Sequence, residues 1–458
     1  MPDFSIPEYR VSVDLLRPGV FIRIERVNWF KHPFLFNSFK IESEEQIQVL
    51  RGLGISEVIC VPEQSDRLPG RSRPRTEVPA TPLTKPAPGR AADTGMFGAA
   101  TPAKAAKAKA PAAQSPTPDQ AQAIDRLWEI KKERTRRLQD KKKRLAVCEE
   151  RFTAFTRDLE GMTKRMVSGR AGAVAEALAF VERMAAQLLG DRESTLHLMN
   201  VMTPVERSYS HAVNVAVLAM MLGKEAGFES GDLVLAGMGA LFHDIGKTRL
   251  EKKLLRKRGP LSPSEETLMR RHPDMGREIL AEVKEFPVQA LDIVARHHER
   301  VDGSGYPAGL SGEDVSPLVS AVSIADAYDS LCNAPDQDEA LTPYLALSVL
   351  FSQHKTRFDR DLLPLFIRCL GVYPPGTVVQ LSNGAIGMVM AVNPENQLAP
   401  SVVLHDPEIP KKEALIVDLR EEPGLKVEKS IRPAHLPPEI FEYLSPRTRI
   451  TYYMEPEK

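Results

Sequence analysis

Five histidines and two aspartates of this 458-residue chain could hold metal ions, because they gather in one part of it. The chain has ten histidines, and half of them fall within residues 211–298. Asp244 follows His243 directly, and Asp326 lies in the apolar segment VSIADAY, where an unpaired carboxylate would be costly to bury. Chance is a poor explanation for such clustering. The clustered histidines are His211, His243, His272, His297 and His298.

The chemistry of this set points to divalent metals and phosphoesters. Imidazole and carboxylate ligands suit first-row divalent ions, and no nearby cysteine pair offers thiolate ligands. Seven ligands are too many for one ion, but a carboxylate such as Asp244 can bridge two. A metal pair about 3.5–4 Å apart can activate a shared hydroxide and clamp phosphate oxygens. Lys247, four residues after His243, would lie near the site if the helix continued and could neutralise phosphate charge.

Each histidine also has a structural interpretation. A single residue such as His211 within an apolar helix, or His272 beside Met269, is more often a hydrogen-bonded core residue than a ligand. Two adjacent imidazoles on an apolar helix, as at His297 and His298, are difficult to satisfy without a common partner. We therefore predict metal binding for the set. Five other histidines are interpreted as ordinary: His32, His197, His354, His405 and His435.

The segment HHERVDGSGYP, residues 297–307, adds a loop to the cluster. Its glycines permit positive φ angles and close ligand approach, and Tyr306 offers a stacking face with a hydroxyl. The same pattern also fits a tight turn that closes a helix.

Composition limits the classes of partner. Lys plus Arg and Asp plus Glu both total 61, so no whole-chain field favours nucleic acid or an acidic membrane. The basic stretch 131–144 is interpreted as a solvated helix face because no aromatic residues interleave it, and we do not expect nucleic-acid binding. Four distant cysteines without a CxxC motif indicate a reducing compartment, and no apolar run approaches the ~20 residues of a membrane span. A cytoplasmic location is expected.

Length and pattern predict a multidomain chain. Residues 1–66 show strand-like alternation and are expected to form a small α+β or β module. Residues 67–118 are rich in Pro, Ala and Lys and are predicted to be a disordered linker. Residues 119–168 are predicted to form a long helix. An all-α domain is expected over 169–372, and a small β-barrel-like module over 373–458, where Asn383-Gly384 is a hairpin signal.

Two helical patterns are specific enough to test. Apolar residues recur every seven positions from Leu138 to Met166, which is compatible with a coiled coil, and we predict a homodimer through residues 138–166. Ser262, Pro263 and Glu265 form a capping box that starts a helix. That helix is expected to run on to His272 with a buried Leu268/Met269 face.

The motifs HDIGK at 243–247 and HHERVDGSGYP at 297–307 resemble the HD-GYP family, bacterial phosphodiesterases of cyclic di-GMP within the HD superfamily. The resemblance covers about Gly169 to Leu370 and includes the upstream His211. It also includes an HPxxG-like segment at 272–276 and a DxxD pair, Asp326 and Asp329. The N-terminal segment resembles a module that often precedes such domains, and the tail from Tyr373 is similarly familiar. An HD-type helical core is the fold that the resemblance implies.

The resemblance also implies roles for particular residues. Asp244 and Lys247 would be catalytic. Two metal ions, iron or manganese, are expected rather than three, because Arg207 stands where some members have a third-metal glutamate and Glu206 is one residue off. The implied metal ligands are His211, His243, Asp244, His272, His297, His298 and Asp326. The implied substrate-binding residues are Lys247, Arg300, Asp302, Gly305, Tyr306 and Pro307.

Three functions remain open at this point. The first is hydrolysis of cyclic di-GMP to linear pGpG, to GMP or to both. The second is a catalytically weak cyclic-dinucleotide sensor or scaffold that binds signalling proteins through the 297–307 loop. Arg207 motivates this second function, as does the segment SLCNAPDQDEALTPY, which stands where the family carries a phosphate-binding RPYR-like stretch. The third is hydrolysis of another nucleotide, since such sites recognise phosphoesters through metals more than through bases.

Overall fold

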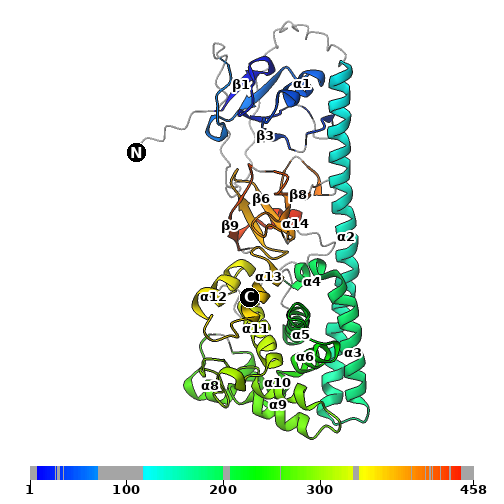
Figure 1. Ribbon diagram of the computed structural model, residues 1–458, viewed down its shortest axis with the longest axis vertical. Helices are drawn as coiled ribbons and strands as arrows, with labels where there is room; N and C mark the ends of the chain where they lie inside the picture. The colour runs from blue at the N-terminus through cyan, green and yellow to red at the C-terminus, as the bar shows by residue number, and fades with distance from the viewer. Residues whose placement is uncertain are drawn as a thin grey trace, which may run out of the picture. The chain divides into compact units, whose positions relative to one another are not determined.

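The computed structural model describes residues 8–70 and 117–444, apart from 26, 28–30, 35, 200–206, 258, 334–339, 394, 408, 412–413, 415, 423 and 433–434. Most of the predicted linker, residues 71–116, lies outside this part of the chain. The chain divides into two compact units, residues 1–133 and 134–458. Helix α2 (Pro118–Val167) runs through the boundary between them (Figure 1).

The first unit is an α+β module, as expected for the N-terminal region. Its four strands pair antiparallel in the order β1-β4-β2-β3, and Ser43 caps helix α1 by accepting from Gln46 N. Buried Ile, Val and Leu side chains fill one core, against which Ala123, Ile124 and Leu127 of α2 also pack. The elements are β1 (Tyr9–Ser12), η1 (Val13–Leu15), β2 (Phe21–Arg23), β3 (Ser38–Lys40), α1 (Glu44–Gly52), β4 (Glu57–Cys60) and η3 (Pro62–Gln64).

The second unit is built mainly of helices, coloured green to yellow in Figure 1. None of the described helices is both long and apolar enough to span a bilayer. The helices are α3 (Ala173–Leu188), η4 (Leu189–Asp191), α4 (Arg192–Met199), α5 (Arg207–Glu225), α6 (Ser230–Phe242), η6 (Ile245–Arg249), α7 (Lys252–Leu255), α8 (Pro263–Met269), α9 (His272–Ala281), α10 (Val288–Arg296), η7 (Gly312–Asp314), α11 (Pro317–Cys332), α12 (Pro343–Gln353) and α13 (Leu362–Leu370).

The heptad seam of α2 is part of the second unit's core. Its apolar side chains from Leu145 to Met166 are at most 6% exposed. Phe155, for example, meets Phe180 of α3 edge to face, with ring centroids 5.1 Å apart. The homodimer through residues 138–166 was predicted from an exposed seam. That premise is wrong, because the chain's own core covers the seam from Leu145 onward. The side chain of Leu138 lies outside the described residues.

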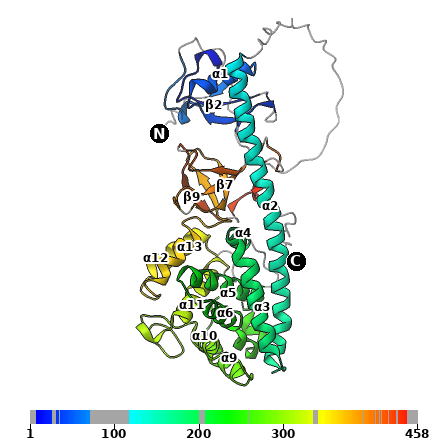
Figure 2. The same cartoon turned by 45° about the vertical axis from the view of Figure 1, so that its right-hand side comes forward.

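The C-terminal sheet is open rather than closed. Five antiparallel strands pair in the order β8-β7-β6-β5-β9, and no pairing joins β8 to β9 within the described residues, so the barrel-like prediction is not confirmed (Figure 2). The predicted hairpin at Asn383-Gly384 joins β5 and β6, and Gly384 has a φ of 80°. Met388 and Met390 share the helical core. The elements are β5 (Val378–Leu381), β6 (Ile386–Ala391), β7 (Ser401–Leu404), β8 (Ile416–Asp418), β9 (Val427–Ile431) and α14 (Pro438–Leu444).

Helix α8 begins where its capping box predicts but ends early. Ser262 Oγ accepts from Glu265 N, and the Glu265 carboxylate accepts from Ser262 N. The helix ends at Met269, a turn follows, and α9 starts at His272. The expectation of one helix reaching His272 was therefore wrong. The expectation of a buried Leu268 was also wrong, because this side chain is 38% exposed. The break lets His272 begin a separate helix, which sets its direction independently of α8.

Candidate metal centre

Five helices of the second unit, α5, α6, α9, α10 and α11, carry the predicted ligands or lead into them, and Figure 1 labels each of these helices. Three of the ligand segments lie at helix ends, where the chain turns and side chains can point across to other helices. His243 follows α6, His272 starts α9, and His297 follows α10. His211 lies within α5 and Asp326 within α11.

Backbone carbonyls determine which nitrogen of three buried histidines faces the centre. The Nδ1–H of His243, His272 and His297 each donates to the carbonyl three residues earlier, at 2.6, 2.7 and 2.9 Å. A carbonyl can only accept, so Nδ1 carries the proton in each neutral ring and Nε2 carries the lone pair. All three side chains are at most 1% exposed. Their Nε2 lone pairs are therefore buried, oriented and available to a metal ion.

Two of these lone pairs face each other. The Nε2 atoms of His272 and His297 are 3.0 Å apart. Burial lowers the pKa of both rings, and for His297 the pKa falls well below its usual range, so neither ring is protonated near neutral pH. Two lone pairs at this distance repel each other unless a cation lies between or beside them. This arrangement fits a metal-binding site and is unfavourable as ordinary packing.

Asp244 lies among these nitrogens. Its Oδ1 is 3.3 Å from His272 Nε2, and its Oδ2 is 3.5 Å from His243 Nε2. Although burial raises the carboxyl pKa, the nearby Lys247 ammonium lowers the pKa of Asp244 well below its usual range. Its Oδ1 and the Nε2 of His243 are buried and accept no hydrogen bond from any described residue. Such orphaned atoms inside a polar cluster fit cation ligands.

Asp326 connects the remaining two histidines. Its Oδ1 is 3.2 Å from His211 Nε2, and its Oδ2 is 3.7 Å from His298 Nδ1. Burial opposes protonation of His211, but Asp326 and Asp329 together raise its pKa to about 10. Burial lowers the pKa of His298 to about 3. The two rings thus differ in charge because only His211 is held between two carboxylates.

All seven predicted metal ligands lie in this one cluster. Their ligand atoms form three overlapping groups, each with its atoms within 4.8 Å of one another. His243 and His297 belong to two groups each, which makes the cluster continuous. The groups are His272, His297 and His298; His211, His243 and Asp326; and His243, Asp244 and His297.

Asp329 holds His211 in place, a role that the sequence reasoning did not assign. Its Oδ2 accepts from His211 Nδ1 at 2.7 Å, and its Oδ1 accepts from Asn214 at 2.7 Å and Asn333 at 2.9 Å. Asp329 is 2% exposed. A carboxylate behind a ligating imidazole orients the ring and raises its basicity. The DxxD spacing with Asp326 was the available signal, since one helical turn places both carboxylates on one face of α11.

The 297–307 loop is held from inside by its own charged residues. Glu299 is 1% exposed and accepts from Ala308 N at 2.6 Å and Leu310 N at 2.9 Å. Arg300 donates to Ser323 and to the carbonyls of His297 and Glu299, and its guanidinium lies 4.9 Å from the Phe358 ring. Both side chains are therefore engaged in shaping the loop. Sequence reasoning missed Glu299, because its polar neighbours His298 and Arg300 gave no sign that its side chain is buried.

The other predicted substrate residues differ in what they contact. Tyr306 stacks on His298, with ring centroids 4.6 Å apart. Burial raises the pKa of the Tyr306 hydroxyl, which stays protonated at neutral pH. Asp302 accepts from Ser304 at 2.6 Å and is mostly a turn-forming residue. A Cβ at Gly305 would collide with the Arg300 and Glu299 backbone, so only glycine fits there. Pro307 follows Tyr306 through a cis peptide bond.

Lys247 reaches the centre by a different route from the one expected. Helix α6 ends at Phe242 and the chain continues as the 3-10 segment η6, so the helix does not carry on to Lys247. The tighter turn still aims the ammonium inward, and Lys247 donates to Asp244 Oδ2 at 2.6 Å. Gly246 lies so close to the His272 carbonyl that a Cβ would clash with it. This contact packs η6 against the start of α9.

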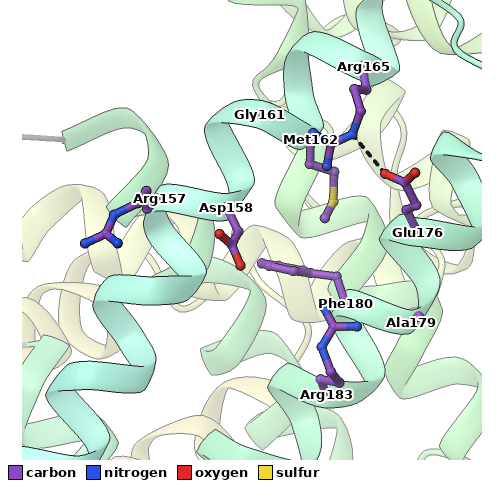
Figure 3. A pocket seen from close by; sticks show the side chains of 9 residues that line it. All are labelled: Arg157, Asp158, Gly161, Met162, Arg165, Glu176, Ala179, Phe180 and Arg183. Carbon is purple, nitrogen blue, oxygen red and sulfur yellow. Dashed lines mark hydrogen bonds and ion pairs between the residues drawn. The ribbon is translucent and has the colours of Figure 1, made fainter.

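A cavity of about 460 Å³ lies elsewhere in the second unit, between α2 and α3 (Figure 3). Arg165 and Glu176 form an ion pair of 2.9 Å across it. No histidine or cysteine lines it, so it lacks the ligand types of the metal centre. The lining residues are Arg157, Asp158, Gly161, Met162, Arg165, Glu176, Ala179, Phe180 and Arg183.

Comparisons with known families agree with the resemblance seen in the motifs. Residues 199–362 match the HD domain family, and residues 8–177 match a domain of unknown function (DUF3391). The chain therefore carries an HD domain that contains the whole histidine cluster. The second match spans the N-terminal module, residues 71–116 and α2.

Among the proteins similar to this chain are two curated relatives and one solved structure. Cyclic di-GMP phosphodiesterase PA4108 of Pseudomonas aeruginosa is 26% identical over 394 residues, 86% of this chain and 84% of that protein. Cyclic di-GMP phosphodiesterase response regulator RpfG of Xanthomonas campestris is 35% identical over 152 residues, 33% of this chain and only 40% of that protein. Bd1817, an HDGYP protein of Bdellovibrio bacteriovorus, has a TM-score of 0.43 at 16% identity and covers 78% of this chain and 98% of that one.

Proposed function

We propose that this HD-domain protein is a metal-dependent phosphodiesterase that hydrolyses cyclic di-GMP to pGpG, to GMP or to both. The observation that carries the proposal is the pair of Nε2 lone pairs of His272 and His297, 3.0 Å apart and buried. A cluster of neutral imidazoles and ionised carboxylates is the ligand set of a hydrolytic metal site. The relatives' names support the substrate, and the four free cysteines support a reducing, cytoplasmic setting.

We propose two ions, iron or manganese, held by the seven clustered ligands. Asp244 presents one carboxylate oxygen towards His272 and the other towards His243, which supports a bridging position between two ions. When bound, such ions supply Lewis-acid charge to phosphoryl oxygens and activate water near neutral pH. The expectation of two ions rather than three depends on Glu206 and Arg207, and Glu206 and the Arg207 side chain lie outside the described residues.

The chain's own residues would orient the phosphodiester and balance its charge. Lys247 lies next to Asp244 and can donate to a phosphoryl oxygen as negative charge develops there. Its pKa is raised despite burial, because Asp244 keeps the ammonium charged. Tyr306 stacks on His298 at the edge of the metal centre and would line the nucleotide pocket from the loop. Glu299 and Arg300 hold that loop from within rather than presenting free charge to substrate.

Turnover by metal-loaded protein tests the proposal. Wild-type protein purified without oxygen should convert cyclic di-GMP to linear product, and Asp244→Ala should lower kcat at least ~100-fold because it removes a ligand of both ions. Chromatography of the products separates pGpG from GMP. Equal turnover by wild type and Asp244→Ala would refute the proposal. Faster turnover of cyclic GMP-AMP would move the assignment to another nucleotide, and tight binding without product would favour the sensor role.

A further inference from the structure

An arginine that takes no part in the metal centre lies over the ring of Tyr306. The Arg270 guanidinium lies 5.1 Å from the centre of the Tyr306 ring, whose other ring contact is His298 at 4.6 Å. Arg270 occupies the turn between α8 and α9, two residues before His272. Its side chain is 53% exposed, so Arg270 is open to solvent although it lies over the tyrosine ring.

Arg270 differs from the two other cationic side chains near the 297–307 loop. Lys247 is tied to Asp244 at 2.6 Å, and Arg300 is directed into the protein towards Ser323 and two carbonyls. Both side chains are thus engaged with the protein itself, Lys247 beside the metal ligands and Arg300 inside the loop. Arg270 has only one charged partner among the described residues, Glu266, at 2.7 Å. That carboxylate is 54% exposed, and an exposed ion pair of this kind is readily exchanged.

We propose that Arg270 binds the phosphate of the cyclic dinucleotide that is not being hydrolysed, displacing Glu266 as it does so. The inference rests on the proposed function and names a contact for the second half of that substrate. A cyclic dinucleotide carries two phosphodiester anions, and the metal centre can neutralise only the one it cleaves. A guanidinium matches a phosphate in bidentate geometry, and packing on Tyr306 restricts the side chain before substrate arrives.

Arg271 offers a matched control. It is the next residue, has the same charge and is exposed, but it contacts no aromatic ring of the loop among the described residues. Steady-state KM and kcat should be measured for wild type, Arg270→Ala and Arg271→Ala with cyclic di-GMP. We expect Arg270→Ala to raise KM about 10- to 100-fold with little change in kcat, as for the loss of a charged hydrogen bond to bound substrate. Arg271→Ala should match wild type.

Two further arms separate a substrate contact from a structural effect. The one-phosphate diester bis(p-nitrophenyl) phosphate should show the same KM in Arg270→Ala and wild type, because it has no second phosphate. Glu266→Gln should lower the KM for cyclic di-GMP by up to about fivefold, because it releases Arg270 from its ion pair. Equal KM values for Arg270→Ala and Arg271→Ala with cyclic di-GMP would overturn the inference. An equal rise with both substrates would also overturn it.

Failure of the proposed function is recognised separately. If wild-type protein turns over no cyclic di-GMP, that function is refuted, and calorimetric binding of cyclic di-GMP then decides the role of Arg270. A Kd at least tenfold weaker for Arg270→Ala than for Arg271→Ala supports the inference. Equal Kd values, or no binding by the wild type, overturn it.

Discussion

At the residue scale, the metal centre is prepared by groups that would never touch the ions. Each carbonyl three residues before His243, His272 and His297 fixes the proton on Nδ1, which leaves Nε2 free to ligate. In His211 the Nδ1 hydrogen bond is accepted by a carboxylate, that of Asp329. An uncharged carbonyl leaves the ring less basic than a carboxylate does. His211 is thus expected to be the most basic ligand of the set.

Removal of Asp329 should weaken metal binding without removing a ligand. Asp329→Ala frees the His211 ring from its 2.7 Å hydrogen bond, and loss of such outer partners costs about 10- to 100-fold in metal affinity. Manganese titration followed by calorimetry measures this. Asp314→Ala, an exposed acidic residue of η7, is the control and should bind as wild type does. Unchanged affinity in Asp329→Ala would show that His211 is oriented by α5 alone.

At the element scale, α2 shows how one apolar pattern can serve two structures. A heptad seam is equally suited to a partner helix of another chain and to the chain's own core. Here α3 and other helices of the second unit cover the seam, so its residues contribute to folding stability within one chain. The exposed side of the same helix carries residues such as Val147, which is 47% exposed.

Truncation of the seam should therefore destabilise the fold and leave oligomeric state unchanged. Phe155 is 6% exposed and packs edge to face on Phe180, so Phe155→Ala should lower the free energy of unfolding by about 3–5 kcal/mol. Val147→Ala on the same helix should change it by no more than about 0.5 kcal/mol. Chemical denaturation measures both. If Phe155→Ala instead shifts a dimer–monomer equilibrium in sedimentation, the seam is an interface.

The N-terminal module should be sensitive to acid through His32. Burial is the main cause that lowers the pKa of His32, to about 4, while its ring bonds Asn37 at 2.7 Å. The unfolded chain, with a pKa near 6.5, binds the proton more readily than the folded chain. The contribution of neutral His32 to the stability of the folded module is therefore complete above about pH 6.5. As the pH falls towards 4, the free energy of unfolding decreases by about 3 kcal/mol.

Hydrogen exchange of peptides from residues 8–66, corrected for intrinsic rates, measures this loss between pH 7 and pH 4.5. His32→Asn should flatten the pH dependence because the residue no longer titrates. Peptides of α3 provide the internal reference. An unchanged slope in His32→Asn would assign the acid sensitivity to another group.

At the scale of the whole molecule, the centre joins segments that are distant in sequence. Its ligands come from five helices between residues 207 and 332, so bound ions would cross-link most of the HD domain. The net charge of zero supplies no long-range field, so local groups must attract the anionic substrate. Stability of the second unit should therefore depend on metal, whereas that of the first unit should not.

Removal of metal should lower the melting temperature of the second unit. At a free metal concentration of ~100 Kd the folded state gains about 2.7 kcal/mol, which corresponds to about 5–10 °C for a domain of this size. Calorimetry of metal-loaded and chelator-treated protein measures the shift. His297→Ala should abolish it, and His435→Ala, at an exposed position, should keep it. A shift that persists in His297→Ala would place the ions elsewhere.

Features that depend on residue type at short spacing could be predicted from the sequence alone. The capping box at Ser262, the hairpin at Asn383-Gly384 and the histidine and aspartate set each depend on residue type at short spacing, which the chain carries wherever it folds. Three other features depended on packing between distant segments: the burial of the α2 seam, the turn that ends α8 at Met269, and the inward direction of Arg300. A residue's own neighbours in sequence cannot specify which distant surface covers it, and only the tertiary structure decides that.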